Sequence, residues 1–433
     1  MKLLITGGGT GGHVNPGLAI AKYAQSRRND VEIRFAGTST GIESKLVPRE
    51  GYKLYTVDVR GLKRSMSPSA VLYNIATLQK SLTATAKAKK ILREYQPDVV
   101  VGCGGYASYP MVHAAQQLHI PTVLLEVNAF PGVVTKSCAK KADRVLINFE
   151  NTRELLENRP NIRLTGAPVR GEIIFADREK ARKKMKLADD EKLVVSFWGS
   201  LGALYMNRHM AGFIELESQH DSFRHIHATG TAAYKWLPDS IKEKGVDLDK
   251  HPNIELREYI YDMADVMAAA DLVICRAGAA TLGELCVLGK PSIIVPSPYV
   301  AENHQEKNAR ALEQKGACQV ITEPECTPEK LYHAVTDLLA DDEKLAEMGR
   351  CAKTMAILDS SEKIYQYILE AARKLETAGE TAAMQKHIGP ERRTLLAIER
   401  RAANRIIHPV HPAPARVPAA PSWNGRKRKS ADA

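Results

Sequence analysis

Short apolar runs rich in Val, Ile and Leu alternate with helix-length segments through the first 340 residues. Such runs are typical of strands buried on both faces, and the longer segments are typical of crossover helices in βαβ units. One series predicts strands at Lys2–Thr6, Val31–Ala36, Leu54–Val57, Asp98–Gly102, Pro121–Leu125 and Arg144–Asn148. A second series predicts strands at Lys192–Phe197, Phe223–Ala228, Ile254–Arg257, Asp271–Cys275, Pro291–Val295 and Cys318–Thr322. The sequence therefore predicts an α/β protein with two Rossmann-like domains, each built on a parallel sheet, and a cleft between them.

Chain length and the positions of Gly and Pro suggest where the domains begin and end. A chain of 433 residues exceeds the roughly 250–300 residues at which one hydrophobic core stops growing. Gly166 and Pro168 interrupt the pattern between the two series, so we expect a first domain over 1–165 and a second over 166–341. Residues 376–433 are basic and Pro-rich, and we expect a disordered tail with a short helix near 392–407.

The net charge of +11 lies mainly in that tail. Residues 384–433 hold eleven Lys or Arg and three Asp or Glu, which leaves +3 for the rest of the chain. The main body is therefore only mildly basic, and we do not expect nucleic acid as its partner. A nucleic-acid-binding role carried by the tail stays an alternative, because basic segments neutralise phosphates without a fold.

Three features favour a cytoplasmic protein. No run of about 18 apolar residues predicts a transmembrane helix. The first strand starts at Lys2, too early for the apolar core of a signal peptide. Seven cysteines without a CxxC pair fit a reducing compartment.

The first candidate site is the glycine cluster Gly7–Gly12, directly after the first strand and before a helical stretch. Glycines let the backbone approach a ligand closely, and a helix N-terminus attracts anions. His13 ends the cluster, where a neutral imidazole can accept a proton from a sugar hydroxyl. A ligand-free turn and a capping or core histidine are the alternatives.

Other small-residue turns follow other predicted strands. Gly102–Ser108 and Glu126–Gly132 lie at the same sheet edge, as simple turns or as the floor of a polar site. In the second half, Trp198–Ala203 and Arg276–Glu284 place such turns before helices, where backbone N–H groups can neutralise a diphosphate without a metal ion. Glu284 can accept the hydroxyls of a ribose, unless it is a solvated helix residue. No GxSxG, HExxH or GxxxxGK[ST] motif supports a competing chemistry.

Six motifs in order resemble the MurG family of glycosyltransferases. They are GGTGGHVNP, GGY, NAFPG, GSLGA, RAGAATLGEL, and PSP followed by HQEKNA, and the resemblance covers residues 1 to about 370. It implies the GT-B fold and an inverting transfer of GlcNAc from UDP-GlcNAc to the C4 hydroxyl of lipid I, a polyprenyl-pyrophosphate-linked acceptor. It also implies helices within 342–375 that return to the first domain, no cofactor, and a peripheral location on the cytoplasmic face of the membrane.

The resemblance also implies roles for particular residues. His13 is the candidate catalytic base. The residues expected to line the GlcNAc and diphosphate are Thr10, Gly11, Gly12 and Asn128. Those expected to hold the nucleotide are Arg170, Ser200, Ile260 near the uracil, Ala279, Ala280, Thr281, Leu282, Gly283, Glu284 on the ribose, and Gln305. The sequence departs from the family pattern at Leu125, Val127, Ala167 and Trp198.

A membrane-bound acceptor requires a docking surface. Residues 60–64 and 71–75 mix basic with apolar side chains, which suits anionic lipid headgroups; an amphipathic helix covering the sheet is the alternative. Other functions stay open: a UDP-GlcNAc 2-epimerase, another lipid glycosyltransferase, or a non-enzymatic partner that binds nucleotide sugars.

Overall fold

The computed structural model describes residues 1–57, 59, 83–199 and 202–387. The chain divides into two compact units, residues 1–375 and 376–433, and the described part of the second is the end of one helix. Ser200, the predicted membrane patch at 60–75 and the tail from 388 lie outside the described residues. None of the helices in the described part is long and apolar enough to span a bilayer.

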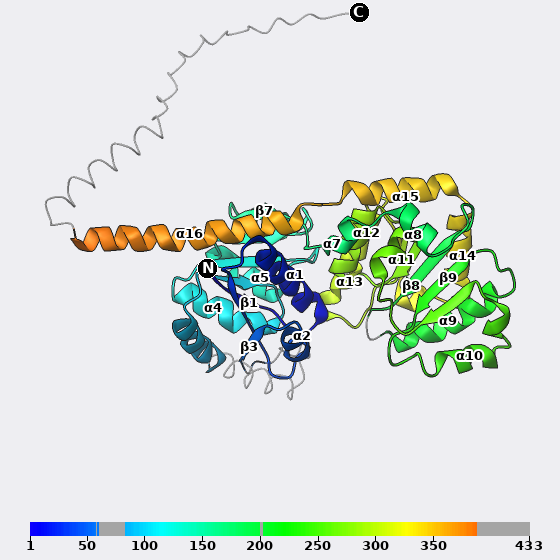
Figure 1. The fold of residues 1–433 in the computed structure, drawn as a ribbon, viewed down its shortest axis with the longest axis horizontal. Coiled ribbons are helices and arrows are strands. Elements are labelled where there is room, and N and C mark those ends of the chain that lie inside the picture. Colours follow the sequence, from blue (N-terminus) through cyan, green and yellow to red (C-terminus); the bar gives the residue numbers. More distant parts are fainter. Residues whose placement is uncertain (58, 60–82, 200–201, 388–433) are drawn as a thin grey trace, which may run out of the picture. The chain divides into compact units, whose positions relative to one another are not determined.

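The first sheet has seven strands, all parallel, in the order β3-β2-β1-β4-β5-β6-β7 (Figure 1). The strands are β1 (Lys2–Thr6), β2 (Glu32–Gly37), β3 (Lys53–Thr56), β4 (Val99–Gly102), β5 (Thr122–Glu126), β6 (Arg144–Ile147) and β7 (Ile162–Leu164). The first six were predicted. β7 was missed because it is a three-residue edge strand whose Leu164 is exposed, so it lacks a continuous apolar run.

Helices cover both faces of this sheet. They are α1 (Gly11–Arg27), α2 (Glu43–Arg49), a helical stretch over 83–95, α4 (Tyr109–Gln117), α5 (Val133–Cys138) and α6 (Thr152–Leu155). α1 begins where it does because Thr10 is extended, with φ −143° and ψ 156°. Its Val14, Leu18 and Ala21 pack into the core beside Leu3 and Ile5 of β1, which holds the start of the helix against the end of that strand.

The second sheet has six parallel strands in the order β10-β9-β8-β11-β12-β13. They are β8 (Leu193–Phe197), β9 (Arg224–Ala228), β10 (Ile254–Arg257), β11 (Leu272–Cys275), β12 (Ser292–Ile294) and β13 (Gln319–Val320). Its helices are α7 (Gly171–Ile174), α8 (Arg178–Lys184), α9 (Leu204–Glu217), α10 (Leu237–Glu243), α11 (Met263–Ala269), α12 (Ala279–Leu288), α13 (His304–Glu313) and α14 (Pro328–Leu339). All six strands were predicted.

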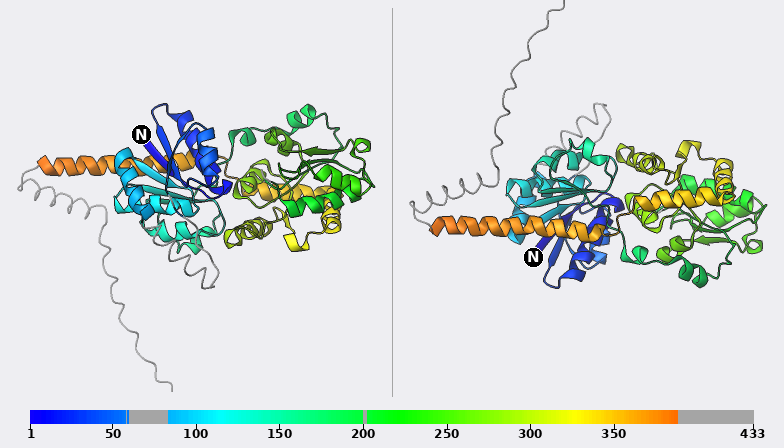
Figure 2. Two further views of the ribbon diagram at one scale, coloured as in Figure 1. Left: turned by 90° about the horizontal axis from the view of Figure 1, so that it is seen from below. Right: turned by 90° about the horizontal axis from the view of Figure 1, so that it is seen from above.

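The last two helices belong to different cores. α15 (Asp342–Thr354) packs Leu345 and Met348 into the second core. α16 (Ser360–His387) places Ile364 and Ile368 in the first core, where Figure 2 shows it in orange beside the first sheet. The helix continues to His387, beyond the Leu375 at which we expected order to end; residues 376–387 contain no proline.

Strand order places two switch points at the ligand-binding edge. In the first sheet the order reverses between β1 and β4, and in the second between β8 and β11. Ligands of open parallel sheets bind outside the carboxyl ends of strands at such points. The glycine turns after β1, β4, β8 and β11 are therefore where ligand binding is expected.

Candidate functional site

His13 is the third residue of α1, and the loop before it sets its orientation. Its Nδ1 lies 3.2 Å from the Gly8 carbonyl oxygen and 3.1 Å from Thr10 Oγ1. A carbonyl can only accept, so Nδ1 carries the proton and donates it to Gly8. In this neutral tautomer Nε2 holds the lone pair, and no described residue hydrogen-bonds to it. The geometry therefore presents His13 Nε2 as a proton acceptor.

The turn after β4 packs directly against His13. Gly104 and Gly105 have φ of +93° and +76°, a region that favours glycine. A Cβ on Gly104 would lie 2.8 Å from His13 Cδ2, and one on Gly105 would lie 2.1 Å from the Gly8 oxygen. Gly8 N also donates to Gly104 O at 3.4 Å. The two glycine loops thus pack directly together, and side chains in the second would displace the imidazole.

The electrostatic surroundings keep His13 neutral. Burial, with a further contribution from His304, lowers its pKa from 6.5 to about 4, although the Gly8 hydrogen bond and Glu43 act in the opposite direction. At neutral pH the ring is therefore unprotonated. The same burial makes it a weaker base than a solvent-exposed histidine.

The loop after β5 is organised by a buried carboxylate. Glu126 accepts from Asn128 N, Gly132 N and Thr135 Oγ1 at 3.1, 2.9 and 2.7 Å. Burial raises the pKa of Glu126 above its ordinary value, although these hydrogen bonds oppose the shift. Asn128, a predicted sugar contact, donates Nδ2 to Glu126 at 3.2 Å and accepts from Asn308 Nδ2 at 3.2 Å. Its side chain is therefore fixed on both sides.

Asn308 on α13 joins the loops that follow β5 and β11. Its Oδ1 accepts from Ala129 N at 2.8 Å, and its Nδ2 lies 3.3 Å from the Ala277 carbonyl. The side chain is fully buried. The loop carrying Asn128 and the turn before α12 are thus tied together.

The start of α12 offers unpaired backbone donors. Gly278 is the N-cap, and the N–H groups of Ala279, Ala280 and Thr281 have no acceptor within the helix. Leu282 differs, because its N–H donates to Gly278 O at 3.0 Å and its side chain is buried. Of these predicted contacts, the first three residues have backbone N–H groups without an acceptor in the helix, and Leu282 packs in the core behind them.

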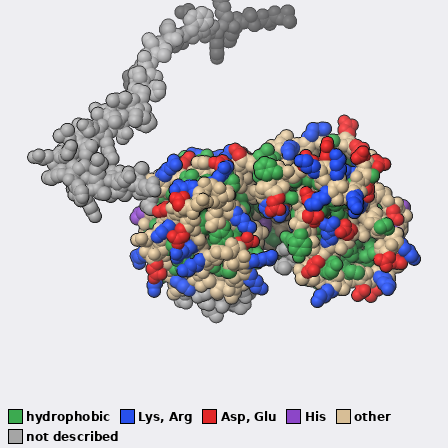
Figure 3. Space-filling view, viewed as in Figure 1, with side chains coloured by type: hydrophobic (Ala, Val, Ile, Leu, Met, Phe, Trp, Pro, Cys, Tyr) green, Lys and Arg blue, Asp and Glu red, His purple; other side chains and the backbone are tan. Residues whose placement is uncertain are grey.

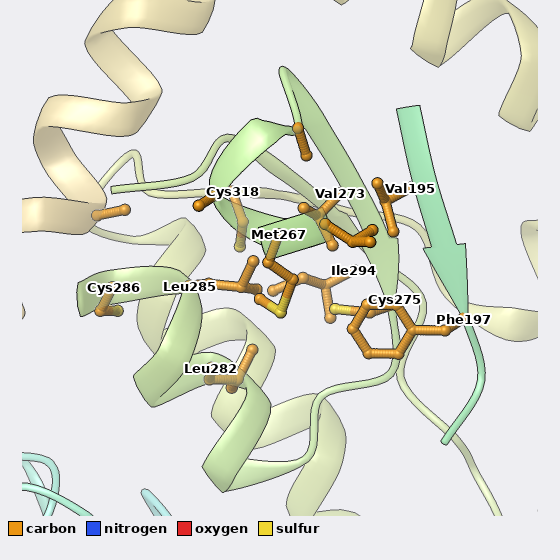
Figure 4. Close-up of a cluster of buried hydrophobic side chains, with 14 of the residues drawn as sticks. Val195, Phe197, Met267, Val273, Cys275, Leu282, Leu285, Cys286, Ile294 and Cys318 are labelled. Atoms are coloured by element: carbon orange, nitrogen blue, oxygen red, sulfur yellow. The ribbon is translucent and has the colours of Figure 1, made fainter. Parts of the chain in front are cut away.

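The opposite face of α12 anchors that helix to the sheet. Figure 4 shows Leu282 and Leu285 in one cluster with Met267, Cys275 and Ile294. Because this packing fixes the helix axis, the unpaired N–H groups at its start are held in place beside the end of β11.

Two predicted nucleotide residues pair with each other. Arg170 Nε donates to Glu284 Oε1 at 2.8 Å, with Glu284 buried and Arg170 exposed. The ion pair orients the carboxylate. A solvated helix glutamate, the alternative in the sequence, does not fit this burial.

The remaining predicted contacts lie at the same edges. Ile260 follows β10 and is 1% exposed, between the exposed Tyr259 and Tyr261. Gln305 on α13 accepts from Ser297 N at 2.9 Å through its side-chain oxygen, which fixes the loop after β12. Gly11 and Gly12 open α1, and Thr10 beside them is exposed.

The departures from the family pattern lie in the core. Leu125, Val127 and Ala167 are buried in the first core, and Trp198 is buried in the second beside Met206 of α9. Within the described residues, Trp198 Nε1 is buried without a hydrogen-bond partner.

Two polar residues of this region were missed from the sequence, Asn308 and Glu43. Asn308 stands in the HQEKNA motif, so the motif gave a signal that we did not assign to a residue. Glu43 looks like an ordinary acidic residue in the first turn of α2, where a solvated side chain is expected, but it is fully buried.

Figure 3 shows acidic and basic side chains interspersed on the face shown, as expected for a mildly basic body.

Comparison with known proteins gives the family. Residues 3–147 match the glycosyltransferase family 28 N-terminal domain, and residues 193–364 match the glycosyltransferase family 28 C-terminal domain. A curated UDP-N-acetylglucosamine–N-acetylmuramyl-(pentapeptide) pyrophosphoryl-undecaprenol N-acetylglucosamine transferase of Acetivibrio thermocellus is 45% identical over 379 residues, covering 88% of this chain and 100% of the relative. The chain belongs to the MurG family. A Clostridioides difficile protein with the same description is 39% identical, over 86% of this chain and 89% of the relative.

Solved structures agree on the fold. The crystal structure of Acinetobacter baumannii MurG has a TM-score of 0.67 and 27% identity, covering 85% of this chain and 99% of that one. A Neisseria meningitidis UDP-GlcNAc 2-epimerase bound to UDP-GlcNAc has a TM-score of 0.56 at 14% identity, covering 86% of this chain and 100% of that one, and shows the fold alone. The GT-B fold that the resemblance implied is confirmed. Among the alternatives, the MurG family is favoured over the epimerase.

Proposed function

We propose that this chain transfers GlcNAc from UDP-GlcNAc to the C4 hydroxyl of lipid I, giving lipid II for peptidoglycan synthesis. The observation that carries the proposal is His13, held at the first switch point with Nδ1 3.2 Å from the Gly8 oxygen, from which we infer that Nε2 is free to accept a proton. The name of the A. thermocellus relative, at 45% identity over 88% of the chain, supplies the donor and the acceptor.

In the proposed reaction the acceptor hydroxyl attacks the anomeric carbon as the bond to the UDP oxygen breaks. His13 Nε2 takes the hydroxyl proton, and UDP leaves with the electron pair. Attack opposite the leaving group inverts the anomeric centre. General-base assistance of this kind contributes about 10²–10⁴-fold.

The nucleotide side of the proposal uses the second switch point. N–H groups of Ala279, Ala280 and Thr281 stabilise the departing diphosphate, and the dipole of α12 adds partial positive charge. Glu284, oriented by Arg170, accepts the ribose hydroxyls, and Ile260 lies at the uracil. Thr10, Gly11, Gly12 and Asn128 line the sugar from the first domain, while Gln305 and Ser200 complete the nucleotide site.

The acceptor is anchored in a membrane, so we propose peripheral association with the cytoplasmic face through anionic lipids. Support comes from the basic and apolar sequence at 60–75. Binding to vesicles with and without phosphatidylglycerol tests this, and equal binding to both would contradict it.

The decisive experiment incubates the chain with radiolabelled UDP-GlcNAc and a short-chain lipid I analogue. We expect label in a lipid-linked disaccharide and release of UDP. Conversion of UDP-GlcNAc to its 2-epimer without an acceptor would favour the epimerase alternative. Donor binding without any turnover would favour the non-enzymatic alternative.

A further inference from the structure

Glu43 is a buried carboxylate to which the proposed reaction gives no task. It is 0% exposed at the start of α2. Its Oε1 accepts from Thr38 N at 2.9 Å and Thr38 Oγ1 at 2.7 Å, and its Oε2 accepts from Gly9 N at 3.0 Å. Burial raises the pKa of Glu43, but these hydrogen bonds outweigh burial and hold the pKa below its ordinary value. The carboxylate is therefore ionised at neutral pH.

Three glycines enclose this carboxylate, one in the loop after β1 and two between the end of β2 and the start of α2. A Cβ on Gly8 would lie 2.3 Å from Oε1, one on Gly41 2.3 Å from Oε2, and one on Gly37 2.6 Å from Cγ. Cβ atoms do not approach other atoms below 3.0 Å without a shift in the structure. The space that holds the Glu43 carboxylate therefore exists only because all three positions lack a side chain. From this space the carboxylate reaches Gly9 N in the glycine loop.

One peptide group connects Glu43 to His13. The N–H of Gly9 and the C=O of Gly8 belong to the same planar unit and point in opposite directions. Glu43 accepts the N–H at 3.0 Å, and His13 Nδ1 donates to the C=O at 3.2 Å. A negative charge on the N–H side polarises the peptide and strengthens its oxygen as an acceptor.

We infer that Glu43 is a positioning residue that acts on His13 through the Gly8–Gly9 peptide. Its carboxylate fixes the peptide plane so that the Gly8 oxygen keeps the proton on Nδ1 and leaves Nε2 unprotonated. A peptide flanked by glycines has little steric resistance to rotation, so a fixed partner is required to hold it. The kinetic part of this inference rests on the proposed function, whereas the effect on the imidazole tautomer does not.

The first test is Glu43→Gln. Both carboxylate oxygens of Glu43 accept hydrogen bonds, one from Gly9 N and the other from Thr38. In either orientation of the glutamine amide, its NH₂ group would therefore face a donor and lose a hydrogen bond. We expect ¹⁵N NMR to show one tautomer with Nδ1 protonated in the wild type and a mixture in the variant, with the His13 signals assigned through His13→Ala. The pKa of His13 should also fall, because the Glu43 charge is one of the influences that raise it.

The kinetic test is a double-mutant cycle with His13→Ala. We expect Glu43→Gln alone to lower kcat about 10-fold or more, but by less than removal of the base. In the His13→Ala background the same change should have little further effect, since it acts through the imidazole. An equal loss of kcat in both backgrounds would overturn the inference.

Two further variants separate positioning from stability. Glu217→Gln is the matched control, because Glu217 is 1% exposed and hydrogen-bonds to His225 in the second core. It should cost stability without changing the His13 signals. Glu43→Asp keeps the charge, but its shorter side chain cannot reach Gly9. This variant replaces Glu43→Gln in the test if Glu43→Gln does not fold, and we expect it to show the same mixture of His13 tautomers. An unchanged tautomer in a folded Glu43 variant refutes the positioning role, whereas a changed tautomer in a chain without transferase activity refutes only the proposed function.

Discussion

The pH dependence of transfer tests the state of His13. A solvent-exposed histidine with a pKa near 6.5 would be half protonated at pH 6.5, and the rate would fall by about half there. In this structure burial and His304 lower the pKa to about 4. Because only the neutral ring can accept a proton, kcat/KM should stay level down to pH 5 and fall as pH drops through about 4.

The bound donor changes this expectation for kcat. A negative charge favours the imidazolium and therefore raises the pKa of a nearby histidine. At an effective dielectric constant of about 20, a unit charge about 7 Å away is worth about 2 kcal/mol, or between one and two pK units. The inflection in kcat should therefore lie above that in kcat/KM, nearer to pH 6.

The assay measures initial rates with radiolabelled UDP-GlcNAc and a soluble lipid I analogue between about pH 3 and 8, a range that includes the inflection expected from the pKa of His13. Subsaturating donor gives kcat/KM, and saturating donor gives kcat. His13→Ala, at about 10²–10⁴-fold lower kcat, should lose both inflections. A kcat/KM inflection near 6.5 would refute the burial argument, and one that persists in His13→Ala would assign it to another group.

Three other outcomes follow from the site. Glu284→Gln should weaken UDP-GlcNAc binding by about 1–3 kcal/mol, as measured by calorimetry, because a charged acceptor is replaced; unchanged affinity would remove Glu284 from the nucleotide site. UDP-GlcNAc binding should survive EDTA, since backbone N–H groups neutralise the diphosphate, and a loss restored only by added metal would contradict this. Gly105→Ala should lower kcat severely while donor affinity holds, because its Cβ would lie 2.1 Å from the Gly8 oxygen at a φ of +76°; a fully active variant would show that the loop can shift without cost.

The strands of this fold are predictable from sequence where they are buried on both faces. Every residue of β4 and β8 is buried, for example, and Ser196 is the only polar side chain among them. β7 was not predicted because Ile162–Leu164 forms a strand through its pairing with β6 at the edge of the sheet and not through its composition. The end of α16 at His387 was not predicted because the Pro-rich sequence beyond it dominated the composition of residues 376–433. The end of a helix depends on the local sequence around it.

The glycine loops of the site were predictable for a similar reason, since a glycine turn after a strand is visible along the chain. The contacts that organise the loops were not. Glu43 acts on Gly9 across 34 positions, and Asn308 reaches Ala129 across 179. Only the packed fold brings such pairs together, and no local pattern distinguishes a glutamate bound to a loop from one in solvent.

Burial in the first core explains why the departures at Leu125 and Val127 leave the loop intact. Leu125 and Glu126, the last two residues of β5, point to opposite faces of the sheet, and Val127, just after the strand, packs in the same core as Leu125. Leu125 and Val127 are 1% and 3% exposed within the first core, where their apolar side chains need no hydrogen-bond partner. Glu126 accepts a hydrogen bond from Asn128, and Asn128 accepts one from Asn308. The polar residues that order this loop are thus independent of the two substituted positions, and the substitutions act through packing rather than through the hydrogen bonds beside the proposed sugar site.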